Sequence, residues 1–241
     1  MAKGPTNILD LRRLLAERFP AAHARANAPT TLAGRGGGGN RSLRETAVWP
    51  TGVPGWDDFL RGLPRGGITE VVGEGAGSGS AQLVHALLAR TAEEGRFLAL
   101  VDGADSFDVD GADPAALSRM LWVRCRKADE ALKATDLLLR DRNVPLVVLD
   151  LKLNPAVQLK KVPSSVWHRF GRIAGQNGTT LLVVTPFAMV GATALRVELR
   201  SDLGIDDLDA GLPGMLKRLR IRIVRAATEE SRSAEAAASS G

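Results

Sequence analysis

Two continuously apolar segments constrain the fold of this chain more than any other feature. They are VPLVVLDL at 144–151 and TTLLVVTP at 179–186, and neither alternates between polar and apolar residues. A strand without a polar face is buried on both sides, which is typical of a parallel sheet between two layers of helices. Helical segments of about 10–15 residues alternate with such strands. We therefore predict an α/β fold with a doubly wound, mostly parallel sheet covered by helices.

The remaining elements follow from hydrophobic spacing and from the glycines and prolines that bound each segment. Two late segments, 195–202 and 216–226, alternate with a period of two, as antiparallel or edge strands do. The predicted strands of the parallel sheet are 68–72, 97–102, 121–125, 144–151 and 179–186, and the predicted helices are 80–95, a short one near 114–120, 129–141 and 163–178.

The last strand presents a stripe of arginines that alternate with apolar residues. Such a stripe is a candidate DNA-binding surface, because arginines neutralise phosphates. It is also what the solvated face of an edge strand looks like, where positive charge prevents unwanted strand pairing, and we favour this second interpretation. The candidate DNA-binding residues of the stripe are Arg218, Arg220 and Arg222.

Composition divides the chain into four parts. Residues 1–26 contain a predicted amphipathic helix, 27–45 form a glycine-rich linker, 46–226 form the α/β core, and 227–241 are a polar tail expected to be disordered. The apolar face of the first helix either packs on its own core or docks on a partner, and both interpretations stay open. Its candidate partner-binding residues are Ile8, Leu11, Leu14, Leu15 and Phe19.

Charge and cysteine content exclude several classes of protein. The net charge of +5, from 32 basic and 27 acidic residues, is a mild bias toward acidic partners such as nucleic acid. A single cysteine, Cys125, excludes an internal disulfide framework and fits a reducing compartment. No cluster of residues has the spacing of a metal site. No apolar run reaches the roughly 18 residues of a membrane helix, so we predict a cytoplasmic protein.

A glycine-rich turn lies between the strand 68–72 and the next helix, which is the setting of a phosphate-binding loop. Against the motif G-x-x-x-x-G-K-[ST], Gly73 and Ser80 match, but Ser78 replaces the second glycine and Gly79 the lysine. Backbone N–H groups still suit an anion and Ser80 suits magnesium, yet Gly79 brings no charge to the phosphates of ATP. We expect no cofactor, with any binding of ATP and magnesium a remnant. The candidate nucleotide-binding residues are Gly73, Gly75, Gly77, Ser78, Gly79, Ser80 and Asp150, the last at the end of a buried strand.

Four segments resemble RecA, in the same order along residues 46–226. TGVPGWDDFLRGLPRGG (51–67) resembles the RecA segment that leads into its phosphate loop, and FLALVDGADSFD (97–108) resembles the strand that carries its catalytic glutamate. VPLVVLDL resembles the RecA strand with the magnesium-binding acid, and TTLLVVTP resembles the strand that ends in its nucleotide-sensing glutamine. The resemblance implies a RecA-like P-loop core with antiparallel terminal strands.

The departures from RecA fall on its functional positions. The lysine, glutamate and glutamine of RecA correspond here to Gly79, Ala104 and Thr185, with Asp102 and Asp105 as candidate substitutes for the glutamate. The second DNA-binding loop is shortened to about seven residues. The first DNA-binding loop is also altered, and its candidate DNA contacts are Lys160 and Lys161.

The chain as a whole resembles the ImuA proteins, which are short, degenerate RecA-like proteins often encoded with the Y-family-like protein ImuB. This resemblance implies a non-catalytic adaptor in SOS-induced mutagenic translesion synthesis, with contacts to an ImuB-like protein and to RecA. Weak DNA binding and self-association are further expectations. The alternatives are a DNA-binding RecA homologue and a nucleotide-dependent DNA repair ATPase, in which Lys152, Lys160 or an arginine of a neighbouring subunit supplies the missing charge.

Overall fold

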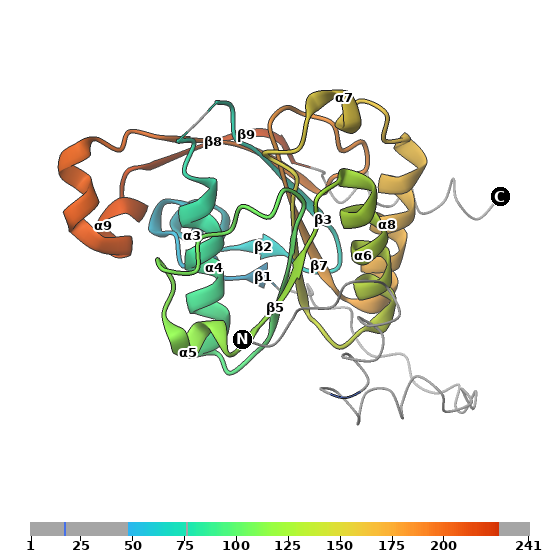
Figure 1. Cartoon of the computed structure of the whole chain (residues 1–241), viewed down its shortest axis with the longest axis horizontal. Coiled ribbons are helices and arrows are strands. Elements are labelled where there is room, and N and C mark those ends of the chain that lie inside the picture. Colours follow the sequence, from blue (N-terminus) through green and yellow to red (C-terminus); the bar gives the residue numbers. More distant parts are fainter. Residues whose placement is uncertain (1–16, 18–47, 76, 227–241) are drawn as a thin grey trace, which may run out of the picture.

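The computed structural model describes residues 17, 48–75 and 77–226. Their centre is a seven-stranded sheet in which every neighbouring pair of strands but one is parallel (Figure 1). The exception is the edge strand β9, which pairs antiparallel with β8. This arrangement confirms the predicted α/β fold with a mostly parallel sheet. From edge to edge the strands are β5 (Met120–Arg124), β4 (Leu98–Asp102), β6 (Leu146–Asp150), β7 (Thr180–Thr185), β3 (Ile68–Val72), β8 (Leu195–Ser201) and β9 (Leu219–Ala226).

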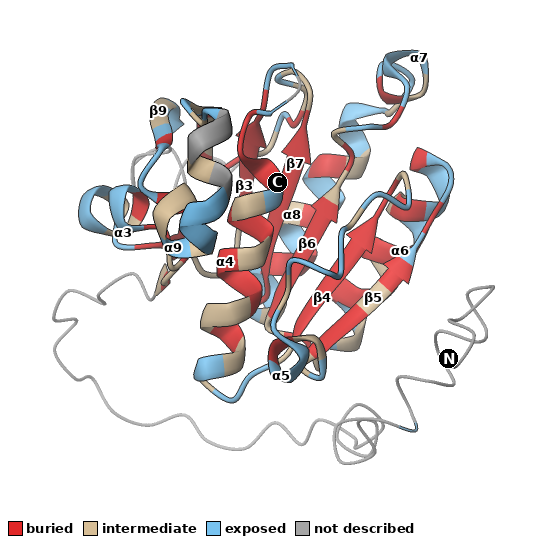
Figure 2. Cartoon of the chain, turned by 60° about the vertical axis from the view of Figure 1, so that its left-hand side comes forward, coloured by how far each residue is buried: buried red, intermediate tan, exposed pale blue. Residues whose placement is uncertain are grey.

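Helices cover both faces of this sheet, and each face has its own apolar core (Figures 1 and 2). The helices bury one side against the strands and leave the other in solvent. One face carries α6 (Ala128–Asp141) and α8 (Ser164–Asn177), whereas the other carries α4 (Ser80–Glu93), α5 (Pro114–Leu117) and α9 (Gly211–Leu216), with the 3-10 helix η1 (Ile205–Ala210) just before α9.

Strand β6 explains why its sequence is apolar throughout. Val147 and Leu149 belong to the core beneath α6 and α8, whereas Leu146 and Val148 belong to the core on the opposite face. All four side chains are fully buried. Burying one such side chain stabilises the fold by about 1.5–3 kcal/mol, so a polar residue on either face of this strand would be costly.

A small antiparallel pair of strands precedes the main sheet. Trp49, in its first strand, is almost fully buried, and the guanidinium carbons of Arg65 and Arg96 lie 4.5 and 4.7 Å from the centre of its ring. Cation–π contacts of this kind stabilise by about 0.5–2 kcal/mol. Trp49 therefore ties this segment to the core. The segment comprises β1 (Val48–Trp49), α3 (Pro54–Leu60) and β2 (Leu63–Pro64).

Two predictions about individual elements are wrong in detail. The segment 195–202 is predicted to be an antiparallel or edge strand; β8 does pair antiparallel with β9, but it lies inside the sheet and runs parallel to β3 on its other side. The helix predicted near 114–120 ends at Leu117, because β5 begins at Met120. The predicted N-terminal helix, the linker at 27–45 and the tail at 227–241 lie outside the described residues, apart from Glu17.

Candidate functional site

The loop between β3 and α4 contains most of the residues predicted to bind phosphate. Its glycines Gly75, Gly77 and Gly79 have φ angles of 68°, 72° and 86°. Only glycine adopts this left-handed region without a steric penalty. Gly79 is also the residue that caps the N-terminus of α4. The glycine spacing seen in the sequence is therefore what the turn from strand to helix requires.

Gly79 has no room for a side chain. A Cβ atom added to it would lie 2.2 Å from Cδ2 of Leu219 and 3.3 Å from Cβ of Ser201. Leu219 is the first residue of β9 and is buried in the core. A lysine at position 79, which the loop motif requires, would have to displace this leucine.

A lysine from another segment reaches the loop instead. Lys152 follows the end of β6, and its Nζ donates hydrogen bonds to Oγ of Ser78 and, at 3.2 Å, to Oγ of Ser80. Both serines are buried. Burial lowers the pKa of Lys152, and the nearby charge of Asp150 opposes this effect. The loop thus holds an amino group at its two hydroxyls although it lacks the lysine of the motif.

Asp150 ends β6, as predicted, and lies beside this lysine. Its Oδ1 accepts a hydrogen bond from the backbone N–H of Lys152 at 2.9 Å. Burial raises the pKa of Asp150 to about 6. Its carboxyl and the hydroxyl of Ser80 are oxygen ligands of the kind that magnesium prefers. Among the described residues, however, no group of three or more histidine, cysteine, aspartate and glutamate side chains is arranged to hold a metal ion.

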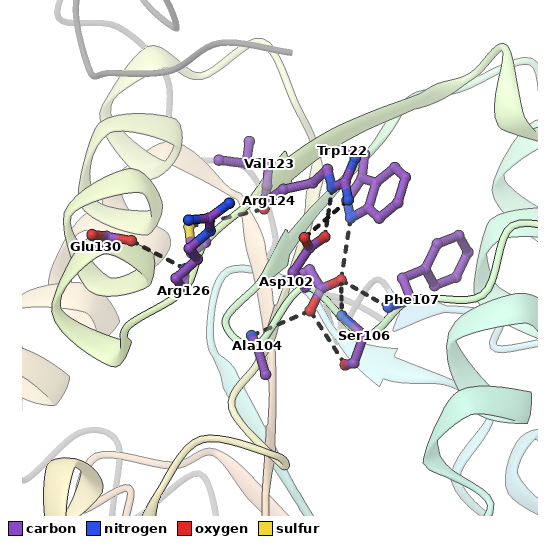
Figure 3. A network of polar contacts seen from close by, with 11 residues as sticks. Asp102, Ala104, Ser106, Phe107, Trp122, Val123, Arg124, Arg126 and Glu130 are labelled. Atoms are coloured by element: carbon purple, nitrogen blue, oxygen red, sulfur yellow. Dashed lines mark hydrogen bonds and ion pairs between the residues drawn. The ribbon is translucent and has the colours of Figure 1, made fainter. Parts of the chain in front are cut away.

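The carboxylate at the end of β4 is engaged by its own loop (Figure 3). Asp102 accepts hydrogen bonds from the backbone N–H groups of Ala104, Ser106 and Phe107, from the Ser106 hydroxyl and from Nε1 of Trp122. It is 1% exposed. A general base needs a free lone pair within reach of the proton that it abstracts. Asp102 instead shapes the turn that contains Ala104, the position predicted from the resemblance to correspond to the catalytic glutamate of RecA.

Asp105, the other candidate substitute, is paired as well. Arg124 donates two hydrogen bonds to its carboxylate, at 2.5 Å from Nε and 2.9 Å from Nη2. These bonds hold the pKa of Asp105 below its usual range. The guanidinium of Arg124 also lies 4.7 Å from the ring of Trp122. A carboxylate with a lowered pKa is a weak base, so neither aspartate is free to replace the glutamate.

A buried carboxylate fixes the segment that follows β7. Glu70, in the middle of β3, has no exposed surface. It accepts hydrogen bonds from the Thr185 hydroxyl, from the backbone N–H groups of Met189 and Val190, and from Nε of Arg196. Thr185, the predicted counterpart of the sensing glutamine, therefore donates its hydroxyl to a carboxylate of its own sheet. The segment 186–194, predicted to be a shortened DNA-binding loop, is held against the sheet.

The predicted DNA-binding residues lie on two separate elements. The three predicted arginines, in β9 and at the residue before it, are exposed, and each forms an ion pair with an acidic residue. Lys160 and Lys161 are exposed just after helix α7 (Ala156–Leu159) and form no ion pair with another described residue. The arginine pairs are Arg218 with Asp207 at 2.9 Å, Arg220 with Asp202 at 3.0 Å, and Arg222 with Glu198 at 2.5 Å.

Sequence reasoning missed two components of the site, Leu219 beside the loop and the Glu70–Arg196 pair. A signal for the second was present, because a glutamate inside an apolar parallel strand needs a buried partner. Comparison with models of known protein families and with curated proteins gives no match. None of the described helices has the length and apolarity needed to cross a membrane.

Proposed function

We propose that the chain is a non-hydrolysing RecA-like accessory protein of SOS-induced mutagenic translesion DNA synthesis. It acts as an adaptor or regulator by binding other proteins, an ImuB-like protein and RecA among them. The RecA-like core is supported by the order of strand, glycine-rich turn and helix at 68–93 and by an acidic residue at the end of β6. The role in translesion synthesis is supported by the resemblance to ImuA proteins.

The observation that carries the non-catalytic part is the position of the Lys152 amino group. It donates to the hydroxyls of Ser78 and Ser80, and in a working P-loop the second of these binds magnesium. A cation bound at that hydroxyl competes with magnesium for the same lone pairs. The carboxylates Asp102 and Asp105 are also engaged, so neither predicted substitute for the glutamate is free to activate the attacking water.

A second function is favoured by the same lysine. An amino group at Ser78 and Ser80 could act on phosphates in place of the lysine that Gly79 replaces, since only its charge and position matter to the transfer. The chain would then be a nucleotide-dependent DNA repair ATPase with a relocated lysine. The two functions differ in one measurable property, which is turnover of ATP.

Phosphate release by the full chain, with and without single-stranded DNA, separates these functions. We expect release at the buffer background under both conditions. A matched pair of variants, Lys152→Met and Lys160→Met, gives the control. ATP turnover that Lys152→Met loses and Lys160→Met keeps would establish the ATPase with a relocated lysine instead. A calorimetric titration that detects no binding of Mg-ATP would count against this ATPase.

The adaptor role has its own test. We expect the immobilised full chain to retain RecA and an ImuB-like protein. The same experiment on a chain lacking residues 1–26 tests whether the predicted N-terminal helix is needed for this binding. Failure to retain either protein with the full chain would contradict the adaptor role.

A further inference from the structure

The segment that follows β6 leaves two large aliphatic side chains in solvent. Leu153 is 65% exposed and Val157 is 64% exposed, the latter on the single turn of α7. Figure 2 shows α7 projecting beyond the ends of the strands, and its first two residues, Ala156 and Val157, are exposed. The other large exposed apolar side chains of the described residues, such as Phe59, lie on other elements. Only this segment therefore presents two of them together.

The segment is held firmly although its apolar side chains are exposed. Leu159 is buried in the core beneath α6 and α8. Nδ2 of Asn154 donates to the carbonyl of Gly103 at 2.7 Å, and Oε1 of Gln158 accepts from the backbone N–H of Ala128 at 3.1 Å. These anchors fix the backbone on both sides of Val157. Because the anchors prevent collapse onto the core, the exposed side chains are presented in a defined arrangement, which lowers the entropy lost when a partner binds.

The charge of the segment is of one sign. Residues 151–163 contain Lys152, Lys160 and Lys161 and no acidic residue. Lys152 is engaged by the loop after β3, whereas the other two lysines are exposed and form no ion pair with another described residue. Surfaces that bind each other have complementary charge. A partner of this segment is therefore expected to be acidic.

The side-chain types favour a protein over a nucleic acid. Binding of single strands relies on aromatic side chains on which bases stack, and residues 151–163 contain none. Leu153 and Val157 match instead the apolar positions of a peptide. We propose that the surface formed by Leu153, Val157, Lys160 and Lys161, called the α7 surface below, binds an acidic amphipathic peptide segment of another protein.

This inference rests on the proposed function only in that it locates one contact surface of the adaptor. The two fail separately, because phosphate release tests catalysis and retention of RecA or the ImuB-like protein tests the adaptor role. Peptide binding to the α7 surface tests the surface itself.

A selection from random peptides identifies the chemistry that the surface prefers. Sixteen-residue peptides, which span on the order of four helical turns, are displayed on phage. They are selected on the full chain and counter-selected on the double variant Leu153→Ser/Val157→Ser. We expect the selected peptides to be rich in aspartate and glutamate with leucine, isoleucine or phenylalanine at helical spacing. No enrichment, or enrichment of basic peptides, would overturn the proposal.

Fluorescence anisotropy with a selected peptide measures the contribution of each part. The double serine variant should lower the affinity about tenfold or more, as truncation of central apolar contacts does. The charge-reversal variant Lys160→Glu/Lys161→Glu should lower the affinity, and the loss should be larger at low salt than at high salt. Phe59→Ser is the matched control, because Phe59 is equally accessible but lies on α3, and it should leave the affinity unchanged. Circular dichroism should give all variants the wild-type Tm, since each altered side chain is exposed.

The same variants test whether the α7 surface binds something else: a second copy of this chain, a nucleic acid or a membrane. A dimer in sedimentation that the double serine variant dissociates would assign the surface to a second copy of this chain. Binding of an oligothymidylate or of phosphatidylglycerol vesicles that both double variants lose, without peptide binding, would assign it to nucleic acid or to a membrane. Each of these results would overturn the proposal.

Discussion

The contact between Gly79 and Leu219 predicts that two neighbouring glycines of one loop tolerate alanine very differently. Gly77 and Gly79 have similar φ angles, 72° and 86°. A Cβ at Gly77 meets no described atom within 4 Å, whereas a Cβ at Gly79 lies 2.2 Å from Cδ2 of Leu219. Both substitutions therefore carry the same left-handed strain, and only one of them also disturbs the core.

The magnitudes follow from these two effects. Alanine in the left-handed region costs about 1–2 kcal/mol, so Gly77→Ala should lower the free energy of unfolding by about that amount. Gly79→Ala should add about 1–3 kcal/mol, the usual cost of forcing an extra carbon into a packed core. The added cost is limited because the clashing atom is the end of a leucine side chain, although Leu219 is only 5% exposed and has little space to move.

Urea unfolding of the full chain, followed by circular dichroism, measures both free energies at constant m. The double variant Gly79→Ala/Leu219→Ala tests the cause, because truncating the leucine should reduce the cost of Gly79→Ala to that of Gly77→Ala. Equal costs for the two single variants, to within about 0.5 kcal/mol, would refute the contact. The same reasoning predicts that Gly79→Lys does not restore a working phosphate loop.

Three further predictions concern the carboxylates around this loop. Because the pKa of Asp150 is raised to about 6, its contribution to stability is fully present only below about pH 4 and is lost as the pH rises through 6. In urea unfolding the wild type should lose about 2 kcal/mol of this contribution between pH 4.5 and 8, and Asp150→Asn should remove that decline. Arg196→Met leaves the buried carboxylate of Glu70 without its ion pair and should cost about 3–5 kcal/mol, part of which Glu70→Gln should restore in the double variant. Asp102→Asn replaces one of its two accepting oxygens by a donating NH2 group and should cost about 2–4 kcal/mol, whereas Asp105→Asn, at an exposed ion pair, should cost less than about 1 kcal/mol by the same unfolding assay.

The sequence predicts the buried strands well, because a strand that is buried on both faces is apolar at every position. Successive side chains from Leu146 to Leu149 pack alternately into the two cores. Few other structures need such a continuous apolar run. The sequence predicts β8 only in part, because its alternating pattern indicates burial but not pairing. Alternation in 195–202 reports that one face is buried and the other holds Arg196 and Glu198. Alternation does not tell how many neighbours a strand has: β8 is antiparallel to β9, as predicted, and also parallel to β3.

The candidate site is predictable only where it is local in sequence. The turn at 73–80 follows from glycine spacing, since the positive φ angles that it needs favour glycine. The lysine that reaches Ser78 is 74 residues away along the chain, and Leu219 is further still. Long-range contacts of this kind depend on the order of strands in the sheet, which places the ends of β3, β6 and β9 near one another without any signal in the local pattern.

The edge of the sheet formed by the carboxyl ends of its strands is where open α/β sheets bind ligands. Two polar side chains of that edge have internal partners: Lys152 at the serines after β3 and Asp102 in its own turn after β4. Glu70, in the middle of β3, pairs with Arg196 and holds the segment after β7. A site whose donors and acceptors are already paired gains little from a small polar ligand, because each new hydrogen bond replaces an old one. Leu153 and Val157 at the same edge have no such partner, since their surface lies in water. The α7 surface, with Leu153 and Val157 beside two exposed lysines, is the part of this edge that we propose a protein segment covers.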